Sequence, residues 1–491
     1  MSVTRKITSG IFWVAASTAA SRAFSFAATL VLAKLLVPED FGLVQTAFLA
    51  LESLQLLREL GFAPALIYRK QDVLEAADAT FFITLATTVV YFTIAFVGAP
   101  QIALLFKEPR VTSVLRALSF TLIISAMGRV HGVMLARELD FRRRALPEIL
   151  PALANGIVAV VLAWQGFGVW SLVWGKLTEA GLGALLLWVV TPWRPGWTFN
   201  RRVAQELFDY GKHIVGSQIL IFFITNVDDA FVMRLLGAAA LGVYGLAYRL
   251  SNLPATQITR LVNQVMFPAF SRLQDDMEAF RRTYFQAVHY VSLLSIPVSI
   301  VTIFFAADFI TVLDADKWGE AVVPIRWLAI YGLLRSVAGN MGNVFKAGGK
   351  PQWLTGIALW RLTTMVLFLY PVTVRYGVVG VSALSGVVAI VDFFISAYLA
   401  NKVIHAPMTV YAYMLGPILS LAVAGTWLGQ QVQQLLIPAP SIPSLLLGGT
   451  LSVLFYVILM LAYDVQLRRL VGRLLTYAVT HRPLQVRRKL E

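Results

Sequence analysis

Cysteine is absent from this sequence of 491 residues, which excludes disulfides, zinc–thiolate sites and thiol catalysis. The five histidines are scattered along the chain and show no spacing typical of metal ligands. There is no nucleophile elbow, and the glycine-rich stretch at 348–349 lacks the spacing of a phosphate-binding loop. We therefore expect no enzyme activity, no catalytic residues, no metal and no cofactor, and nothing indicates an ATP-driven pump.

Charged residues are also scarce. They make up 14% of the chain, where an ordinary soluble domain has about a quarter. Hydrophobic residues make up 58%, the mean hydropathy is +0.73, and apolar runs of about 20 residues recur along the whole length. The first run has no small-residue cleavage site, so we interpret it as a membrane helix rather than a signal peptide. The sequence predicts an all-α polytopic membrane protein with about 14 transmembrane helices.

The boundaries of these helices follow from the apolar runs. We expect them near residues 11–33, 42–64, 79–104, 112–136, 148–165, 169–190, 212–235, 241–266, 285–307, 321–344, 352–374, 377–400, 409–430 and 443–463.

The basic residues outside these helices gather in alternate loops. The net charge is +15, and paired basic residues occur at Arg69-Lys70, Arg201-Arg202 and Arg281-Arg282. Because cytoplasmic loops are enriched in Lys and Arg, this pattern places both termini in the cytoplasm. We interpret the basic tail, 464–491, as a topological anchor next to anionic lipid, and the net charge does not indicate nucleic acid.

The two halves of the chain resemble each other. A shift of 200 residues places Lys34-Leu35-Leu36 on Arg234-Leu235-Leu236 and Gly42 on Gly242, and a shift of 210 places Arg116 on Arg326. We predict two six-helix lobes in a parallel repeat, an N-lobe at 1–200 and a C-lobe at 201–402, followed by two helices at 403–463. Transporters commonly bind substrate between two such halves, which then rock.

Basic residues within the spans outnumber the acidic ones. An arginine at the centre of a membrane helix costs about 3 kcal/mol, so several together should face an aqueous cavity, an acidic partner or an interface. Guanidinium groups suit phosphate geometry, and a lipid-linked pyrophosphate with a sugar headgroup fits such a cavity. The alternative is that some of these residues snorkel or form structural ion pairs. The candidate substrate-binding residues are Arg22, Arg129, Arg249, Arg260, Arg335 and Arg361.

Three acidic residues within the spans are candidates for proton or sodium coupling: Asp228, Asp229 and Asp392. Adjacent carboxylates such as Asp228 and Asp229 repel each other, which suits uptake of a cation. The alternative is that one pairs with an arginine of a neighbouring helix while the other faces polar surroundings.

Several segments resemble the bacterial polysaccharide-transport flippases, the Wzx-like group of the multidrug/oligosaccharidyl-lipid/polysaccharide exporter superfamily. Residues 32–42 (LAKLLVPEDFG) are similar to that family's signature after its first helix. Residues 61–67 (GFAPALI), 137–141 (RELDF) and 242–249 (GVYGLAYR) are similar to other parts of it, and the match runs to about residue 400.

The resemblance implies a flippase that moves undecaprenyl-pyrophosphate-linked oligosaccharide to the periplasmic leaflet for O-antigen, capsule or exopolysaccharide assembly. It implies a polymerase and chain-length machinery as partners, and it carries no binding residue across. Alternatives are a lipid II flippase or drug exporter of the same superfamily, and a membrane polysaccharide polymerase or ligase. The basic excess argues against a cationic drug, and the short outward loops argue against a polymerase.

Overall fold

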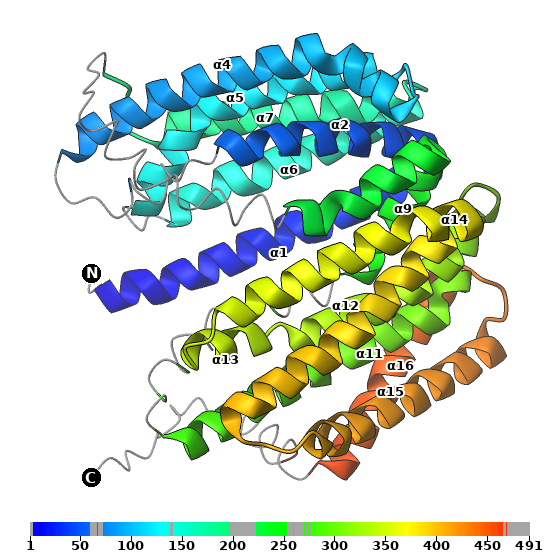
Figure 1. The fold of residues 1–491 in the computed structure, drawn as a ribbon. Coiled ribbons are helices and arrows are strands. Elements are labelled where there is room, and N and C mark those ends of the chain that lie inside the picture. The colour runs from blue at the N-terminus through cyan, green and yellow to red at the C-terminus, as the bar shows by residue number, and fades with distance from the viewer. Residues whose placement is uncertain are drawn as a thin grey trace. The chain divides into compact units, whose positions relative to one another are not determined.

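The structure is a computed structural model that describes residues 3–58, 66, 72–137, 141–196, 222–252, 259, 270, 273, 276–464 and 468. Every regular element in these residues is helical (Figure 1). Eight helical segments of this part of the chain are long and apolar enough to cross a membrane. The prediction of an all-helical polytopic membrane protein is therefore confirmed.

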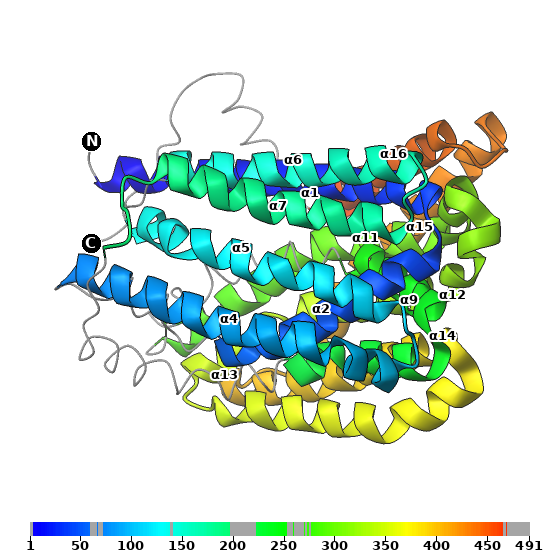
Figure 2. The ribbon, with the colours of Figure 1, turned by 90° about the horizontal axis from the view of Figure 1, so that it is seen from above.

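The described chain divides into two compact units. The first contains Met1–Ala247, Asp316–Ala321 and Ala358–Leu384. Its helices are α1 (Val3–Leu35), α2 (Pro38–Arg58), α4 (Val73–Phe106), α5 (Val111–Arg137), α6 (Phe141–Trp164), α7 (Val169–Val190), a helix over residues 222–236 and the start of α9 (Ala238–Ser251). Neighbouring helices pack in the order α1, α6, α7, α5, α4, while α2 packs on α4, α5 and α7 (Figures 1 and 2).

The N-terminal ends of α2 and α9 cross very closely. A Cβ atom at Gly42 would lie 1.8 Å from the backbone oxygen of Ala238, and one at Gly242 would lie 1.8 Å from that of Pro38. Only glycine leaves room for such a close approach of two backbones. The crossing joins positions that the 200-residue shift aligns in the sequence.

Residues from the second half of the sequence complete the first unit. Trp318 Nε1 donates a hydrogen bond of 2.8 Å to the backbone oxygen of Ala33, and Lys317 Nζ donates one of 3.1 Å to that of Lys34. The Trp318 ring also packs edge-on against Phe41, with 5.6 Å between ring centroids. Because the last carbonyls of a helix have no intrahelical donor, Lys317 and Trp318 cap the C-terminus of α1.

The second unit contains Tyr248–Ala315, Val322–Ile357 and Ser385–Glu491. Its helices are the rest of α9, α11 (Met277–Trp318) as far as Ala315, α12 (Val322–Ala338), α13 (Met341–Ala347), the two ends of α14 (Gln352–Ile404), α15 (Thr409–Leu436) and α16 (Ile442–Tyr463). The last residues of α11, the short 3₁₀ turn after it (Gly319–Ala321) and the middle of α14 belong to the first unit. The hairpin of α15 and α16 is tight, because a Cβ atom at Gly425 or Gly429 would lie 2.6 or 2.5 Å from the backbone nitrogen of Tyr456 or Ser452.

Several helices differ from the predicted spans. α4 and α11 begin at Val73 and Met277, because a helix can continue through charged residues beyond the apolar run that marks the membrane. The predicted span 321–344 is broken between α12 and α13. The predicted spans 352–374 and 377–400 form α14, whose helical backbone is interrupted at Gly377 (φ 58°, ψ −148°), a conformation open almost only to glycine. The predicted spans 212–235 and 241–266 lie partly outside the described residues.

Two arginines within the spans have the same structural role. Arg116 Nε donates to the backbone oxygen of Phe96 at 3.1 Å, and Arg326 Nε donates to that of Ile303 at 3.3 Å. In each case the guanidinium contacts the preceding, antiparallel helix. These residues, which the 210-residue shift aligns, follow the structural alternative considered for the basic residues.

Candidate functional site

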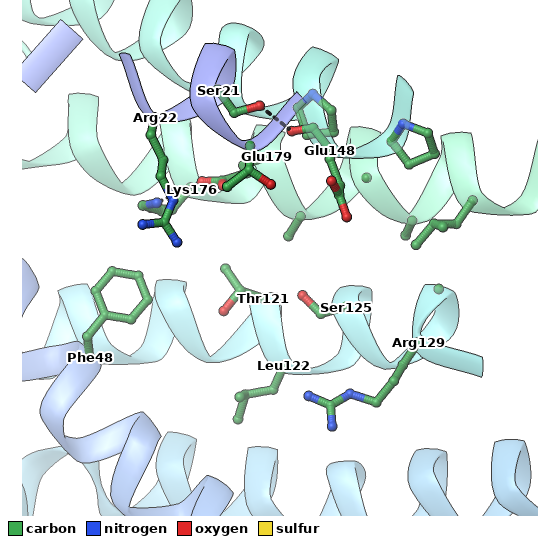
Figure 3. Close-up of a pocket in the computed structure, with 18 residues that line it drawn as sticks. Ser21, Arg22, Phe48, Thr121, Leu122, Ser125, Arg129, Glu148, Lys176 and Glu179 are labelled. Carbon is green, nitrogen blue, oxygen red and sulfur yellow. Dashed lines mark hydrogen bonds and ion pairs between the residues drawn. The ribbon is translucent and has the colours of Figure 1, made fainter. Parts of the chain in front are cut away.

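A cavity of about 650 Å³ lies within the first unit (Figure 3). Side chains from α1, α2, α5, α6 and α7 line it. Small residues create the space between the helices. Gly128 on α5 faces the backbone of Ala184 on α7, and a Cβ atom added at Gly128 would lie 3.0 Å from the Cα of Ala184. Gly183, next to Ala184, also lines the cavity. α6 contributes Pro147 and Pro151, each of which removes one backbone donor from the helix ladder.

The polar lining residues lie on two facing walls. Figure 3 shows Arg22, Glu148, Lys176 and Glu179 on the wall formed by α1, α6 and α7, and Arg129 on the facing wall formed by α5. Hydroxyl groups accompany the charges on both sides, from Thr18, Ser21, Thr121 and Ser125. Hydroxyls donate and accept hydrogen bonds, so this lining can contact both sugar and phosphate oxygens.

The two carboxylates of the cavity already have basic partners. Glu179 Oε2 lies 2.7 Å from Lys176 Nζ and accepts a second hydrogen bond of 2.7 Å from Asn155 Nδ2. Glu148 Oε1 lies 2.8 Å from the Nε of Arg144, which is outside the lining. Three basic side chains therefore face two acidic ones, and an external arginine compensates one of the acids. The cavity has an excess of positive charge, which favours an anionic ligand.

The structure brings together only some of the predicted binding residues. Arg22 and Arg129 both line the cavity, although they come from helices far apart in sequence. Lys176, Glu148 and Glu179 were not among the predicted site residues. The spacing of Lys176 and Glu179, three residues apart on one helix face, was a signal that could have identified these two as a pair.

Three of the other predicted arginines do not line this cavity. Arg335 on α12 donates through Nη1 to the hydroxyls of Tyr248 (3.2 Å) and Tyr331 (3.1 Å), and its guanidinium lies 5.7 Å from the centroid of the Tyr331 ring. Arg249 is exposed on α9, and Arg361 is half-buried on α14. Arg260 lies outside the described residues. Neutral tyrosines position Arg335 without cancelling its charge, so it can still attract an anion.

The adjacent acids Asp228 and Asp229 point to different partners. Tyr244 donates its hydroxyl proton to Asp228 Oδ2 at 2.5 Å. Gln45 Nε2 donates to Asp229 Oδ2 at 2.9 Å. The Gln45 side chain packs against Gly245, where an added Cβ atom would lie only 2.0 Å from Gln45 Oε1. Both acids thus have polar, uncharged partners in the first unit. Asp392, half-buried on α14, accepts from Ser396 Oγ at 3.4 Å.

Residues 31–323 match a family described as polysaccharide biosynthesis protein. The chain belongs to this family. Among curated proteins it is 26% identical to the teichuronic acid biosynthesis protein TuaB of Bacillus subtilis (strain 168), over 84% of this chain and 85% of that protein. It is 22% identical to the lipopolysaccharide biosynthesis protein WzxC of Escherichia coli (strain K12), over 92% of this chain and 89% of that protein.

Solved structures give the fold of this polysaccharide biosynthesis protein. The lipid II flippase MurJ in an inward closed conformation aligns with a TM-score of 0.66 and 11% identity, over 92% of this chain and 98% of that one. An inward-facing multidrug resistance transporter of the MATE family and MOP superfamily aligns with a TM-score of 0.62 and 18% identity, over 77% and 94%. The chain therefore has the fold of the MOP superfamily transporters, as its sequence predicted.

Proposed function

We propose that this protein is a flippase, which moves undecaprenyl-pyrophosphate-linked oligosaccharide repeat units across the bacterial inner membrane for assembly of a surface polysaccharide. The observation that carries this proposal is the cavity of the first unit, where basic side chains and hydroxyls line a space among helices of a membrane protein. A pyrophosphate needs the cations, the sugars need the hydroxyls, and the lipid tail stays in the bilayer. Membership of the polysaccharide biosynthesis family supports the same substrate class.

Transport would proceed by alternating access between two lobes, at 1–200 and 201–402, with helices 403–463 appended and a basic tail at 464–491. Both termini would lie in the cytoplasm, where the basic loops are. Arg22 and Arg129 would bind the anionic headgroup inside the cavity. Arg249, Arg260, Arg335 and Arg361 stay further candidates for contacts to the substrate. A polymerase and chain-length machinery would consume the exported units.

Coupling to a proton or sodium ion would use Asp228, Asp229 or Asp392. The first two accept hydrogen bonds from neutral groups, so neither of those two donors brings a fixed positive charge that would compete with an incoming cation. Dependence of transport on a sodium or proton gradient, lost in Asp229→Asn, would support this part of the proposal. Gradient-independent transport would remove it without affecting the substrate assignment.

The first test is deletion of the gene, with extraction of lipid-linked oligosaccharides and assay of surface polysaccharide. Accumulation of undecaprenyl-pyrophosphate repeat units in the cytoplasmic leaflet, with loss of polymer and rescue by the gene, is the expected result. Repeat units that reach the periplasm and accumulate there unpolymerised would indicate a polymerase instead. Unchanged oligosaccharide pools with altered lipid II would indicate the lipid II alternative.

Variants then test the cavity itself. Loss of one contact to a charged oxygen should lower export by about 10- to 100-fold in Arg22→Ala and Arg129→Ala. Arg375→Ala is a matched control, because Arg375 is exposed on α14, stacks on Tyr376 and does not line the cavity. Normal export by both cavity variants, at normal protein level, would contradict the role of this cavity.

A further inference from the structure

A break interrupts the membrane helix that contains α12 and α13. α12 ends at Ala338 and α13 begins at Met341, so Gly339 and Asn340 form the junction. The Asn340 side chain is fully buried, with 0% exposure. Neither its Nδ2 nor its Oδ1 atom has a hydrogen-bond partner within the described part of the chain. Buried amides are nearly always hydrogen-bonded, so this side chain requires an explanation.

The neighbouring helix presents a second such group at the same level. Ser295 Oγ lies 2.7 Å from Ser336 Oγ, and Arg326 Nε contacts the Ile303 oxygen, so α11 and α12 run antiparallel with a fixed register. Ser292 lies three residues before Ser295, and Asn340 lies four residues after Ser336. Because the two helices are antiparallel, a step back along α11 and a step forward along α12 point in the same direction. At about 1.5 Å per residue, Ser292 and Asn340 lie about 4.5 and 6 Å from the Ser295–Ser336 contact in that direction.

Ser292 is also fully buried, and its hydroxyl likewise has no partner among the residues that the structure describes. By this register the two polar side chains lie at a similar level on facing helices, and neither has a hydrogen-bond partner among the described residues. A buried group of this kind is typically satisfied by an ordered water molecule. Two groups on different helices therefore point to a ligand: the Ser292 hydroxyl on α11 and the Asn340 amide at the α12–α13 junction.

The chemistry of these atoms identifies the ligand. The amide offers both a donor and an acceptor, and the serine hydroxyl can act as either. An anion would satisfy only the donors and a cation only the acceptors. The guanidinium of Arg335, five residues before Asn340, also disfavours a second positive charge nearby. Water alone donates and accepts, so it matches the whole set.

We propose that the Asn340 amide and the Ser292 hydroxyl hold an internal water molecule at the break between α12 and α13. Because hydrogen bonds to water re-form without repacking of side chains, the break can bend while its polar groups stay satisfied. The site gives this membrane helix a hydrated hinge, and it stands independently of the transported substrate.

Hydroxyl-radical footprinting of the intact protein in nanodiscs tests the proposal, since radicals generated from a bound water oxidise the side chains beside it. Met341 follows Asn340 directly and is 1% exposed. Met460 and Met233, at 1% and 0%, are equally buried controls, and Met277, at 41%, is the exposed reference. Met341 should be oxidised at a rate closer to that of Met277 than to those of Met460 and Met233. Oxidation of Met341 as slow as that of the buried controls would overturn the proposal.

A variant separates the bound water from general opening of the helix. Asn340→Leu keeps the size of the side chain and removes both polar atoms, so oxidation of Met341 should fall to the rate of Met460 while Met277 is unchanged. The melting temperature of Asn340→Leu should also be lower than that of the native protein, because the bound water loses its partners. If the native amide binds no water, removing its two polar atoms should raise the melting temperature instead, and that result would contradict the proposal. If Asn340→Leu does not fold, Ser292→Ala serves, with slower oxidation of Met341 expected and unchanged oxidation counting against the site.

Discussion

Gly42 and Gly242 occupy equivalent places in one helix crossing. Gly42 faces the backbone oxygen of Ala238, four residues before Gly242, and Gly242 faces that of Pro38, four residues before Gly42. Each distance to an added Cβ atom would be 1.8 Å. The contact is thus reciprocal, because each glycine faces the first residue of the other helix.

A methyl group at either glycine should push the helices apart. We expect Gly42→Ala and Gly242→Ala each to destabilise the protein by about 1–3 kcal/mol, as overpacking commonly does, measured as a lower melting temperature in detergent. The double variant should cost less than the sum, because the first methyl already separates the backbones. Gly98→Ala is the control, since no atom lies within 4 Å of an added Cβ there. Fully additive effects would show that the two contacts are independent.

The hydrogen bond from Gln45 to Asp229 should depend on charge. Gln45→Glu places a carboxylate against Asp229, so we expect it to lower stability and export more than Gln45→Leu does. Adding Asp229→Asn to Gln45→Glu should restore stability, though not ion-coupled export, because the new amide can donate to the new carboxylate. A double variant as poor as Gln45→Glu alone would argue against this contact.

The hydrogen bond from Trp318 Nε1 to the C-terminus of α1 should contribute to stability. Trp318→Phe keeps an aromatic ring against Phe41 but leaves the Ala33 oxygen without its donor, which should cost about 1–3 kcal/mol. Thermal unfolding in detergent measures the loss. Trp164→Phe is the control, because Trp164 is 80% exposed. Equal melting temperatures for the two variants would mean that the hydrogen bond has no net effect.

An ion-pair cluster between α4 and α5 predicts a pH dependence. Glu108 receives the Arg110 Nε at 2.9 Å, and this hydrogen bond lowers the pKa of Glu108 below its ordinary value of 4.5. The same bond raises the pKa of Arg110, so the guanidinium stays charged. A lowered carboxyl pKa stabilises the folded state above the unfolded pKa, and that stability is lost as the pH falls through the folded pKa.

At pH 7 Glu108→Gln should therefore lower stability by about 0.5–1 kcal/mol, a modest effect because the arginine is half exposed. The difference from the native protein should shrink as the pH falls below 4.5, where Glu108 itself becomes neutral. Melting temperatures of both proteins across this range provide the measurement. A difference that stays constant down to pH 3 would contradict the charge-based explanation.

The sequence predicted the class of fold well because apolar length and loop charge depend on local composition. It also identified Arg22 and Arg129, since a buried arginine is conspicuous in any membrane span. It left Arg116 and Arg326 out of the candidates, but it could not separate Arg22 and Arg129 from Arg335, because a guanidinium that binds tyrosine hydroxyls and one that lines a cavity have the same local surroundings in sequence. The break at Asn340 was missed although the local sequence, 339–343 (GNMGN), is rich in glycine and asparagine, which favour interruption of a helix.

The bond from Trp318 to Ala33 spans 285 residues, and this separation has a consequence for biosynthesis. At about 5–20 residues per second, the ribosome synthesises Trp318, the donor, about 15 to 60 s after it has synthesised the end of α1. The first unit also needs Ala358–Leu384, which is synthesised later still. The N-terminal half is thus finished only during synthesis of the C-terminal half. A fragment that ends at Ala247 would leave the α1 terminus uncapped, and it should be a client of membrane quality control rather than a stable half-protein.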